Sequence, residues 1–198
     1  MPYSPEHKQN TNQRILDSAR RLFNARGFND VSIDEIMADA GLTRGGFYNH
    51  FKAKEDLYAA ILYHFAQQQK VNLEELTRGN PQIAKTIVEA YVSEPHLSDT
   101  DNHCPLMALP SDVARAGPKV RQAYQSVLEA MIHMFENSVE PGSATSQRKR
   151  SLAMTTICVG AMVLARTIDD ESLSEEICAA ARDTALRLIE AEGIDGRE

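Results

Sequence analysis

A chain of 198 residues can hold one large domain or a small domain fused to a larger one, and 42% apolar with 25% charged residues is ordinary for a globular protein. The longest nearly apolar run, residues 155–165, is too short to span a bilayer, and residues 1–10 lack the apolar core of a signal peptide, so we expect a cytoplasmic protein. Three cysteines, Cys104, Cys158 and Cys178, contain no C-x-x-C pair and favour reduced thiols over a disulfide scaffold.

The formal net charge of −7 argues at first against a nucleic-acid partner. The charge is unevenly spread, however. Residues 1–54 contain eight Lys and Arg against six Asp and Glu, whereas residues 55–198 contain thirteen against twenty-two. A small basic unit therefore precedes an acidic body, which would repel DNA and orient the basic end towards it.

Almost every segment has helical periodicity, and no segment shows convincing strand alternation. The pattern predicts a first helix over about residues 11–26, with Gly27 as a left-handed cap. Ser32 and Glu35 have the spacing of a capping box, which predicts the start of a short second helix. Gly41 then makes a turn.

Thr43 begins a third short helix, which we expect to run to about His50, and two short helices joined by a glycine turn have the helix-turn-helix plan that reads the DNA major groove. The free N–H groups at the Thr43 end favour a phosphate. Arg44 can pair with O6 and N7 of guanine. Gly45 and Gly46 are poor helix formers, which indicates that a partner approaches the backbone closely.

Polar and basic side chains follow the two glycines. Tyr48, Asn49 and His50 carry groups able to reach phosphates or base edges, and Lys52 and Lys54 suit backbone phosphates where the next helix begins. The alternative is a small helical hairpin in which the glycines only make a turn. The capping box, the turn glycine and the basic residues together favour DNA binding.

The rest of the chain also has helical patterning, which brings the expected total to about nine helices. The further helices are expected at about residues 54–76, 82–93, 104–116, 118–138, 148–168 and 172–191. Residues 94–103 are polar and predict a loop. Pro110 should kink its helix or delay its start, and Gly117 with Pro118 should end one helix and open the next.

These residues together resemble the TetR family of bacterial transcriptional regulators over about residues 11–60. The matching positions are Ile15, Leu16, Leu22, Phe23, Gly27, Phe28, Ser32, Ile36, Ala40, Gly41, Leu42, Gly45, Phe47, Tyr48, His50, Phe51, Lys54 and Leu57. The resemblance implies an all-α homodimer with a three-helix helix-turn-helix DNA-binding domain over residues 1–53. A larger effector-binding and dimerisation domain would occupy residues 54–198.

The resemblance also implies roles for single residues. Carried over by position, the expected phosphate contacts are Ser32, Tyr48, His50 and Lys54. Arg44 would read a base. Gly46 stands where a hydroxyl residue is common in the family, so one usual contact would be missing.

DNA half-sites about one helical turn apart require a two-fold dimer, and the last two helices are the expected interface because the family pairs them in a four-helix bundle. The expected interface residues are Leu152, Thr156, Val159, Gly160, Val163, Ile177, Ala181, Thr184 and Leu188. The alternative is that these residues form the core of a single chain.

A pocket for a small effector is expected among the middle helices, where methionine and aromatic residues suit an apolar, irregular ligand. The candidates are His64, Phe65, His103, Cys104, Met107, Tyr124, Met131, Phe135, Met162 and Arg166. For each of them plain core packing is the alternative. Arg166 could meet an anionic effector or pair with Asp169 or Asp170, and Cys104 beside His103 could be a reactive thiol or a small core residue.

The sequence thus predicts a ligand-responsive repressor that binds a palindromic operator and is released by a small apolar or electrophilic effector. A DNA-binding architectural or division factor of the same fold, without an effector, is the alternative. An enzyme using Cys104 and His103 would need an orienting group, a metal-ligand pattern, a P-loop or a dinucleotide motif, and the sequence offers none, so we expect no catalysis, no cofactor and no metal.

Overall fold

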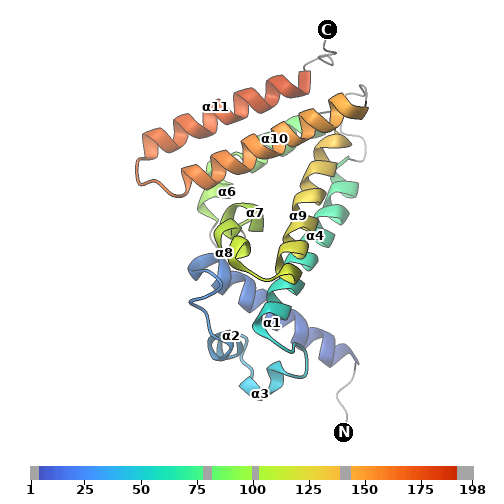
Figure 1. Ribbon diagram of the computed structural model, residues 1–198, viewed down its shortest axis with the longest axis vertical. Coiled ribbons are helices and arrows are strands. Elements are labelled where there is room, and N and C mark those ends of the chain that lie inside the picture. The colour runs from blue at the N-terminus through green and yellow to red at the C-terminus, as the bar shows by residue number, and fades with distance from the viewer. Residues whose placement is uncertain (1–4, 78–81, 100–102, 139–143, 191–198) are drawn as a thin grey trace. The chain divides into compact units, whose positions relative to one another are not determined.

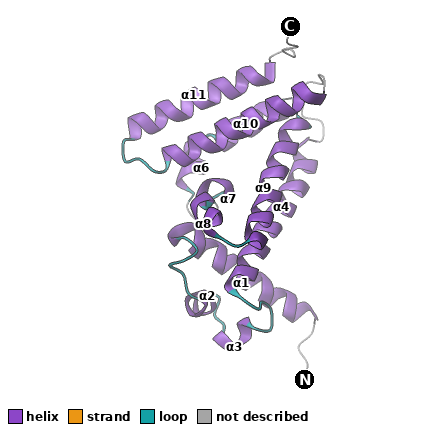
Figure 2. Ribbon diagram, viewed as in Figure 1, coloured by secondary structure: helices purple, strands orange, loops and turns teal. Residues whose placement is uncertain are grey.

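The computed structural model describes residues 5–77, 82–99, 103–138 and 144–190, and every regular element in these ranges is a helix (Figure 2). The helices, labelled in Figure 1, are α1 Pro5–Arg26, α2 Ile33–Asp39, α3 Arg44–Phe47, α4 Lys54–Thr77, α5 Ile83–Tyr91, α6 Glu94–Ser98, α7 Pro105–Ala108, α8 Pro110–Arg115, α9 Pro118–Glu136, α10 Ala144–Ala165 and α11 Glu171–Glu190. The all-α class predicted from the sequence is confirmed.

The helices belong to two compact units. The first comprises the described parts of residues 1–65 and 100–127, and the second those of residues 66–99 and 128–198. The first unit therefore contains the helix-turn-helix together with α7, α8 and the first half of α9. The sequence predicts a domain boundary between residues 53 and 54, and this boundary stays a prediction. Among the described residues, no helix is both long enough and apolar enough to cross a membrane.

The core of the first unit begins on one face of α1. Ile15, Ala19 and Phe23 are almost completely buried, as their spacing predicts for an amphipathic helix. The Phe23 ring lies 5.3 Å from the ring of Phe28 and 5.4 Å from that of Tyr58, and the rings of Phe28 and Tyr58 stack at 4.7 Å. Because each such aromatic pair contributes about 0.5–1.5 kcal/mol, Phe28 is held firmly just beyond the end of α1.

Two glycines in left-handed conformation end α1 and α2. The sequence predicts this conformation for Gly27 and a turn at Gly41. Gly27 has φ +81°, and its N–H donates to the Phe23 carbonyl at 2.8 Å. Gly41 has φ +65°, and the N–H of the next residue, Leu42, donates to the Met37 carbonyl at 2.7 Å. This second pattern is a Schellman motif, which satisfies carbonyls that the end of a helix otherwise leaves free.

The loop predicted over residues 94–103 is wrong, because α6 begins there. The Ser93 hydroxyl accepts a hydrogen bond from the His96 N–H at 3.3 Å, and Pro95 lies in the first turn. Both features are ordinary signals for the start of a helix, and the sequence contains them. Residues 100–102 of this segment lie outside the described residues.

The single helix predicted over residues 104–116 is also wrong, because two short helices take its place. Pro105 opens α7 and Pro110 opens α8, each at the first turn of its helix. A proline has no N–H to continue a helix but suits a first turn, so Pro110 separates the two. Other boundaries also differ from the predictions: α1 begins at Pro5, α3 ends at Phe47, and α10 is Ala144–Ala165 instead of residues 148–168. The described residues form eleven helices, two more than the sequence predicts, because α6 is added and α7 and α8 replace one helix.

In the second unit, α10 and α11 lie side by side (Figure 1). Met154, Cys158 and Met162 on α10 are buried. The Arg182 guanidinium on α11 donates from Nε and Nη2 to the Val92 carbonyl, at 3.1 and 2.8 Å. Val92 caps the carboxyl end of α5, where a positive charge is favourable, so this contact ties α5 to the pair.

The conformation of Gly41 leads to a test of stability. An alanine at this position would have to adopt the left-handed backbone conformation of Gly41. Its Cβ would also lie 2.9 Å from Nη2 of Arg14, which donates to the Ala40 carbonyl at 2.6 Å. We expect Gly41→Ala to lower the free energy of unfolding by at least about 1–2 kcal/mol, measured by denaturant unfolding. Gly117→Ala is the matched control, because a Cβ there meets nothing within 4 Å and the backbone is not left-handed. Equal stability of the two variants would contradict the prediction.

Candidate nucleic-acid interface

The third helix of the helix-turn-helix is short, and it is held by two aromatic anchors. After Phe47 the chain continues as a turn in which the N–H groups of His50 and Phe51 both donate to the Phe47 carbonyl, at 2.9 and 3.0 Å. Phe47 and Phe51 are buried, with ring centroids 5.8 Å apart. Because the anchors face inwards, the side chains between them are presented to solvent.

Most of the residues predicted to bind DNA are on this solvent face. The exposed ones are Ser32, Thr43, Arg44, Gly45, Tyr48, Asn49 and Lys52, and the half-buried ones are Gly46, His50 and Lys54. Tyr48 is 55% exposed, which is unusual for a large aromatic side chain. Thr43 is at the N-cap position of α3, but its side chain makes no capping hydrogen bond.

Gly45 gives the clearest sign of an external partner. A Cβ on Gly45 would meet nothing within 4 Å, and its backbone is not left-handed. The free protein therefore has no steric need for a glycine there, although glycine weakens a helix by up to about 1 kcal/mol relative to alanine. A reason outside the chain, such as a backbone that must approach a partner, explains the residue better than the fold does.

Arg44 is held in a salt bridge on the surface. Its Nη1 lies 2.5 Å from Oδ2 of Asp34, in the first turn of α2, and the two side chains are 61% and 56% exposed. Exposed ion pairs contribute at most about 1 kcal/mol. The guanidinium of Arg44 is thus preoriented by α2 and can still be released to a base or a phosphate at little cost.

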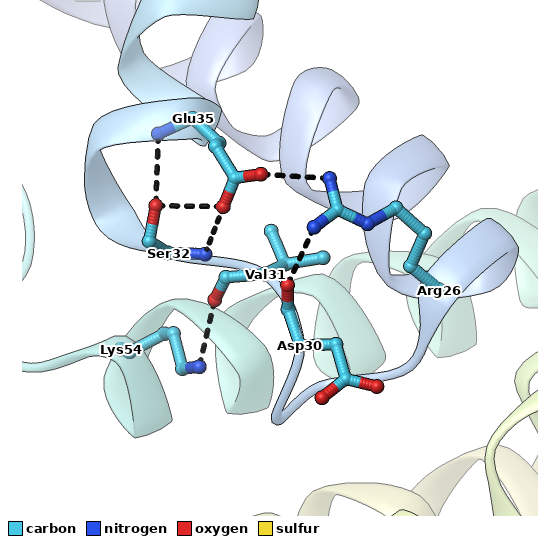
Figure 3. Close-up of polar contacts among 6 residues, drawn as sticks. All are labelled: Arg26, Asp30, Val31, Ser32, Glu35 and Lys54. Carbon is cyan, nitrogen blue, oxygen red and sulfur yellow. Dashed lines mark hydrogen bonds and ion pairs between the residues drawn. The ribbon is translucent and has the colours of Figure 1, made fainter.

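The amino end of α2 is fixed by a network of charged and polar groups (Figure 3). Glu35 Oε2 accepts from the N–H and hydroxyl of Ser32 at 2.8 and 2.7 Å, and the Ser32 hydroxyl accepts from the Glu35 N–H at 3.2 Å. Arg26 bonds the other Glu35 oxygen at 2.8 Å and donates to the Asp30 carbonyl at 2.6 Å. The predicted capping box is therefore confirmed, and Arg26 extends it.

Lys54 is tied into the fold more tightly than the sequence indicates. Its ammonium donates to the carbonyls of Phe28 and Val31 at 2.7 and 2.8 Å and lies 4.2 Å from the centroid of the Phe28 ring. Figure 3 shows the contact with Val31. Burial lowers the pKa of Lys54. An ammonium has three N–H groups, so one donor remains for the predicted phosphate contact.

Lys8 lies near the recognition face, and the sequence reasoning misses it. The His50 imidazole has a lowered pKa, first because it is partly buried and second because of the positive charge of Lys8. Lys8 lies in the first turns of α1, which begin six residues before the predicted start of that helix. The sequence gives no signal for Lys8, because the apolar periodicity of α1 begins only at Ile15.

Comparison with known proteins agrees with this geometry. The family model of bacterial regulatory proteins, tetR family, matches residues 15–61. Residues 15–61 therefore carry the amino-terminal domain of the TetR family. The regulator AcrR of Shigella flexneri is 48% identical over 56 residues, which are 28% of this chain and 26% of AcrR. The repressor BepR of Brucella suis is 30% identical over 92 residues, 46% of this chain and 44% of BepR. The chain thus spans less than half the length of either relative.

Solved structures resemble the chain over more of its length. The reduced form of NemR from E. coli has a TM-score of 0.74 at 21% identity and covers 93% of this chain and 99% of its own. A TetR regulator from Legionella pneumophila has a TM-score of 0.75 at 20% identity, with the same coverage of both chains. At this level of identity the likeness shows the fold alone, and it extends the TetR fold beyond the amino-terminal domain.

The predicted effector residues are divided between the two units of this TetR fold. The first unit holds His64, Phe65, His103, Cys104, Met107 and Tyr124, and the second holds Met131, Phe135, Met162 and Arg166. Cys104 is 5% exposed, and burial raises the pKa of Tyr124 to about 12. The Tyr124 hydroxyl donates to the Leu106 carbonyl at 3.1 Å. A common pocket for these residues stays a prediction.

Two hollows lie on the described surface of α1, and neither is lined by a predicted effector residue. One, of about 340 Å³, lies where the α1 residues Arg14 and Arg21 meet Asp39 and Gly41 at the end of α2. The other, of about 360 Å³, lies along α1 from Glu6 to Arg14. Within the described residues, no three His, Cys, Asp or Glu side chains are grouped so that they could hold a metal ion.

The predicted dimer residues differ in exposure. Leu152 and Thr156 are exposed, Ala181 is buried, and the half-buried ones are Val159, Gly160, Val163, Ile177, Thr184 and Leu188. One further exposed leucine on the same helix pair, Leu164, is missed by the sequence reasoning. No periodic signal marks Leu164, because the apolar residues of α10 do not gather on one face of that helix.

The capping box predicts how stability depends on pH. The N–H of Ser32, its hydroxyl and Arg26, in that order, lower the pKa of Glu35 from 4.5 to about 2. The ionised carboxylate therefore stabilises the fold above about pH 4.5, and this contribution is lost as the pH falls towards 2. Glu35→Gln keeps an oxygen for the cap but cannot ionise. We expect its melting temperature to lie below that of the wild type near neutral pH, with a gap that narrows as the pH falls from 4.5 to 2. A gap that does not change with pH would refute this.

Proposed function

We propose that this protein is a transcriptional repressor that binds an operator as a homodimer and is released by a small effector. The observation that carries the proposal is the recognition face, where α3 and the turn after it present Arg44, Tyr48 and Asn49 while Phe47 and Phe51 anchor them. BepR, which matches 46% of this chain, is itself named a repressor.

Binding would place α3 in the major groove. Arg44 would leave Asp34, or share its guanidinium with it, and bond a guanine edge, a contact typically worth about 1–3 kcal/mol of discrimination. Gly45 would let the backbone approach the DNA, and Tyr48 and Lys52 would bond phosphates on either side. Phosphate contacts fix the position of the protein, whereas the contact of Arg44 selects the sequence.

A homodimer is supported by apolar side chains that are exposed to solvent on α10 and α11. Leu152 and Leu164 on α10 are 41% and 56% exposed, and Leu173 on α11 is 44% exposed. Exposed leucines on two adjacent helices offer apolar surface that a second copy can cover. One short recognition helix also reads too few base pairs, so a second copy doubles the site.

Release by an effector is supported by the methionine and aromatic residues buried in both units. Met107, Phe135 and Met162 are at most 1% exposed, and adaptable side chains of this kind suit an apolar ligand. An effector acts by binding one arrangement of the helices better than another, typically by about 1–3 kcal/mol. That range corresponds to a change of about 5- to 150-fold in operator affinity.

The function is tested by selecting sites from random DNA with the wild-type protein and titrating the selected duplex. Arg44→Ala should weaken binding to the selected site by about 5- to 150-fold for each half-site and relax the preference for one base, because the guanine contact is lost in both subunits. With about eight phosphate contacts per dimer, log affinity should fall with log salt at a slope of about −7. Arg148→Ala is the matched control, an exposed arginine paired with Glu136 in the second unit. Failure of the wild type to enrich any sequence would refute the function.

The dimer is tested by adding a charge to its proposed interface. We expect Leu152→Glu to shift the protein towards the monomer mass in sedimentation and to weaken operator binding, because a carboxylate would be buried opposite its two-fold mate. Val71→Glu is the control, because Val71 is 57% exposed on α4 and not on α10 or α11. An unchanged dimer mass for the Leu152 variant would place the interface elsewhere.

A further inference from the structure

The helix-turn-helix is joined to a segment far along the chain by two hydrogen bonds. The Asn24 side-chain amide, near the end of α1, donates to the His103 carbonyl at 3.2 Å. The N–H of Phe28 donates to Oδ2 of Asp112, on α8, at 2.9 Å. Residues 103–115 therefore belong to the same compact unit as the DNA-binding helices, and each end of this segment contacts α1 or the residues just after it.

The position of Asp112 depends on a glycine. A Cβ on Gly27 would lie 3.0 Å from Oδ2 of Asp112, so a side chain there would crowd the carboxylate. Gly27 also has φ +81°, which is needed to end α1. The carboxylate is 15% exposed, and its Oδ1 accepts from Nη2 of Arg115 at 3.1 Å. Arg115 thus contacts the oxygen that the main chain of Phe28 does not use.

The peptide groups around Phe28 are held from two sides. Asp112 takes the N–H of Phe28, and Lys54 donates to its carbonyl at 2.7 Å. The ring of Phe28 stacks on Tyr58 at 4.7 Å. From Phe28 the chain reaches Ser32, the N-cap of α2, in four residues. Whatever moves the Phe28 peptide moves the start of α2, and α2 carries α3 through the Gly41 turn.

We propose that Asp112 is a positioning residue for DNA binding, which sets the placement of α2 and α3 by holding the main chain of Phe28. The proposal rests on the proposed function. The carboxylate touches no DNA; it acts through the turn between α1 and α2. Base-edge contacts carry the sequence information and depend on the exact placement of α3 in the groove, whereas phosphate contacts are available on any duplex. Loss of the Asp112 contact should therefore weaken selective binding more than non-selective binding.

The experiment compares two duplexes of equal length, the site selected by the wild type and an unrelated sequence, with full-length protein. Asp112→Ala should weaken binding to the selected site by about tenfold, the usual effect of losing a hydrogen bond to a charged group, and change binding to the unrelated duplex by less than about twofold. A variant that is merely less folded has a smaller active fraction, which lowers both affinities equally. The ratio of the two affinities therefore separates positioning from stability.

Three further variants and one spectroscopic signal complete the test. Asp112→Asn should restore the ratio, because its amide oxygen can accept from Phe28, and Arg115→Ala should leave it unchanged. Asp112→Glu keeps the charge but moves the acceptor, so it should lower the ratio even if the alanine variant does not fold. Exchange of the Phe28 amide hydrogen should be faster in the alanine and glutamate variants only.

Equal losses on both duplexes, or a glutamate variant with the wild-type ratio, would overturn the role of Asp112 while leaving the proposed function intact. A wild type that selects no site would remove the proposed function itself, and this inference with it. An unchanged exchange rate for the Phe28 amide in Asp112→Ala would also overturn the inference, because the hydrogen bond would then not constrain the turn.

Discussion

The DNA-binding helices depend on how the turn between α1 and α2, residues 27–32, is held. This turn has no regular structure of its own, so its N–H and carbonyl groups need partners from elsewhere. Charged side chains supply them: Arg26 bonds the Asp30 carbonyl, Lys54 bonds two carbonyls, and Asp112 takes the Phe28 N–H. These hydrogen bonds are charge-assisted and stronger than neutral ones. They come from three helices, α1, α4 and α8, and so the turn has the rigidity of the unit that surrounds it.

Contacts within the protein also show that the basic residues among the first 54 have different roles. Several of the basic groups are engaged within the protein, among them Arg21 with Asp39, Arg26 with Glu35 and Arg44 with Asp34. These pairs are exposed, so they weaken in salt and exchange readily for a phosphate or a base. Lys54 is different, because neutral carbonyls and the face of an aromatic ring hold its ammonium. The basic residues therefore divide into exchangeable ones and structural ones, a division that net charge does not reveal.

Local patterns in the sequence were sufficient for the parts of the site that depend on neighbouring residues. The capping box of Ser32 and Glu35, the left-handed glycines and the buried Phe47 and Phe51 all follow from spacing and side-chain chemistry. The role of Lys54 and the contact of Asp112 do not, because a residue 84 positions away from Phe28 leaves no periodic signal. Helix α6 is a separate case: Ser93 and Pro95 signal the start of a helix, whereas the polar composition of the segment is typical of a loop.

The recognition helix cannot hold its own shape, and this sets where specificity comes from. α3 has four residues, two of them glycines, which is far below the length at which an isolated helix is stable. The side chains that it and the next residue present to solvent add little support, since an exposed ion pair holds Arg44 and Tyr48 is 55% exposed. The geometry of α3 must therefore be imposed by its anchors Phe47 and Phe51 and by α2, which in turn depends on the turn between α1 and α2. On the proposed function, base selection would be a property of the whole first unit, and Asp112 on α8, 84 positions along the chain from Phe28, would belong to the DNA-binding apparatus as much as the residues that face the groove.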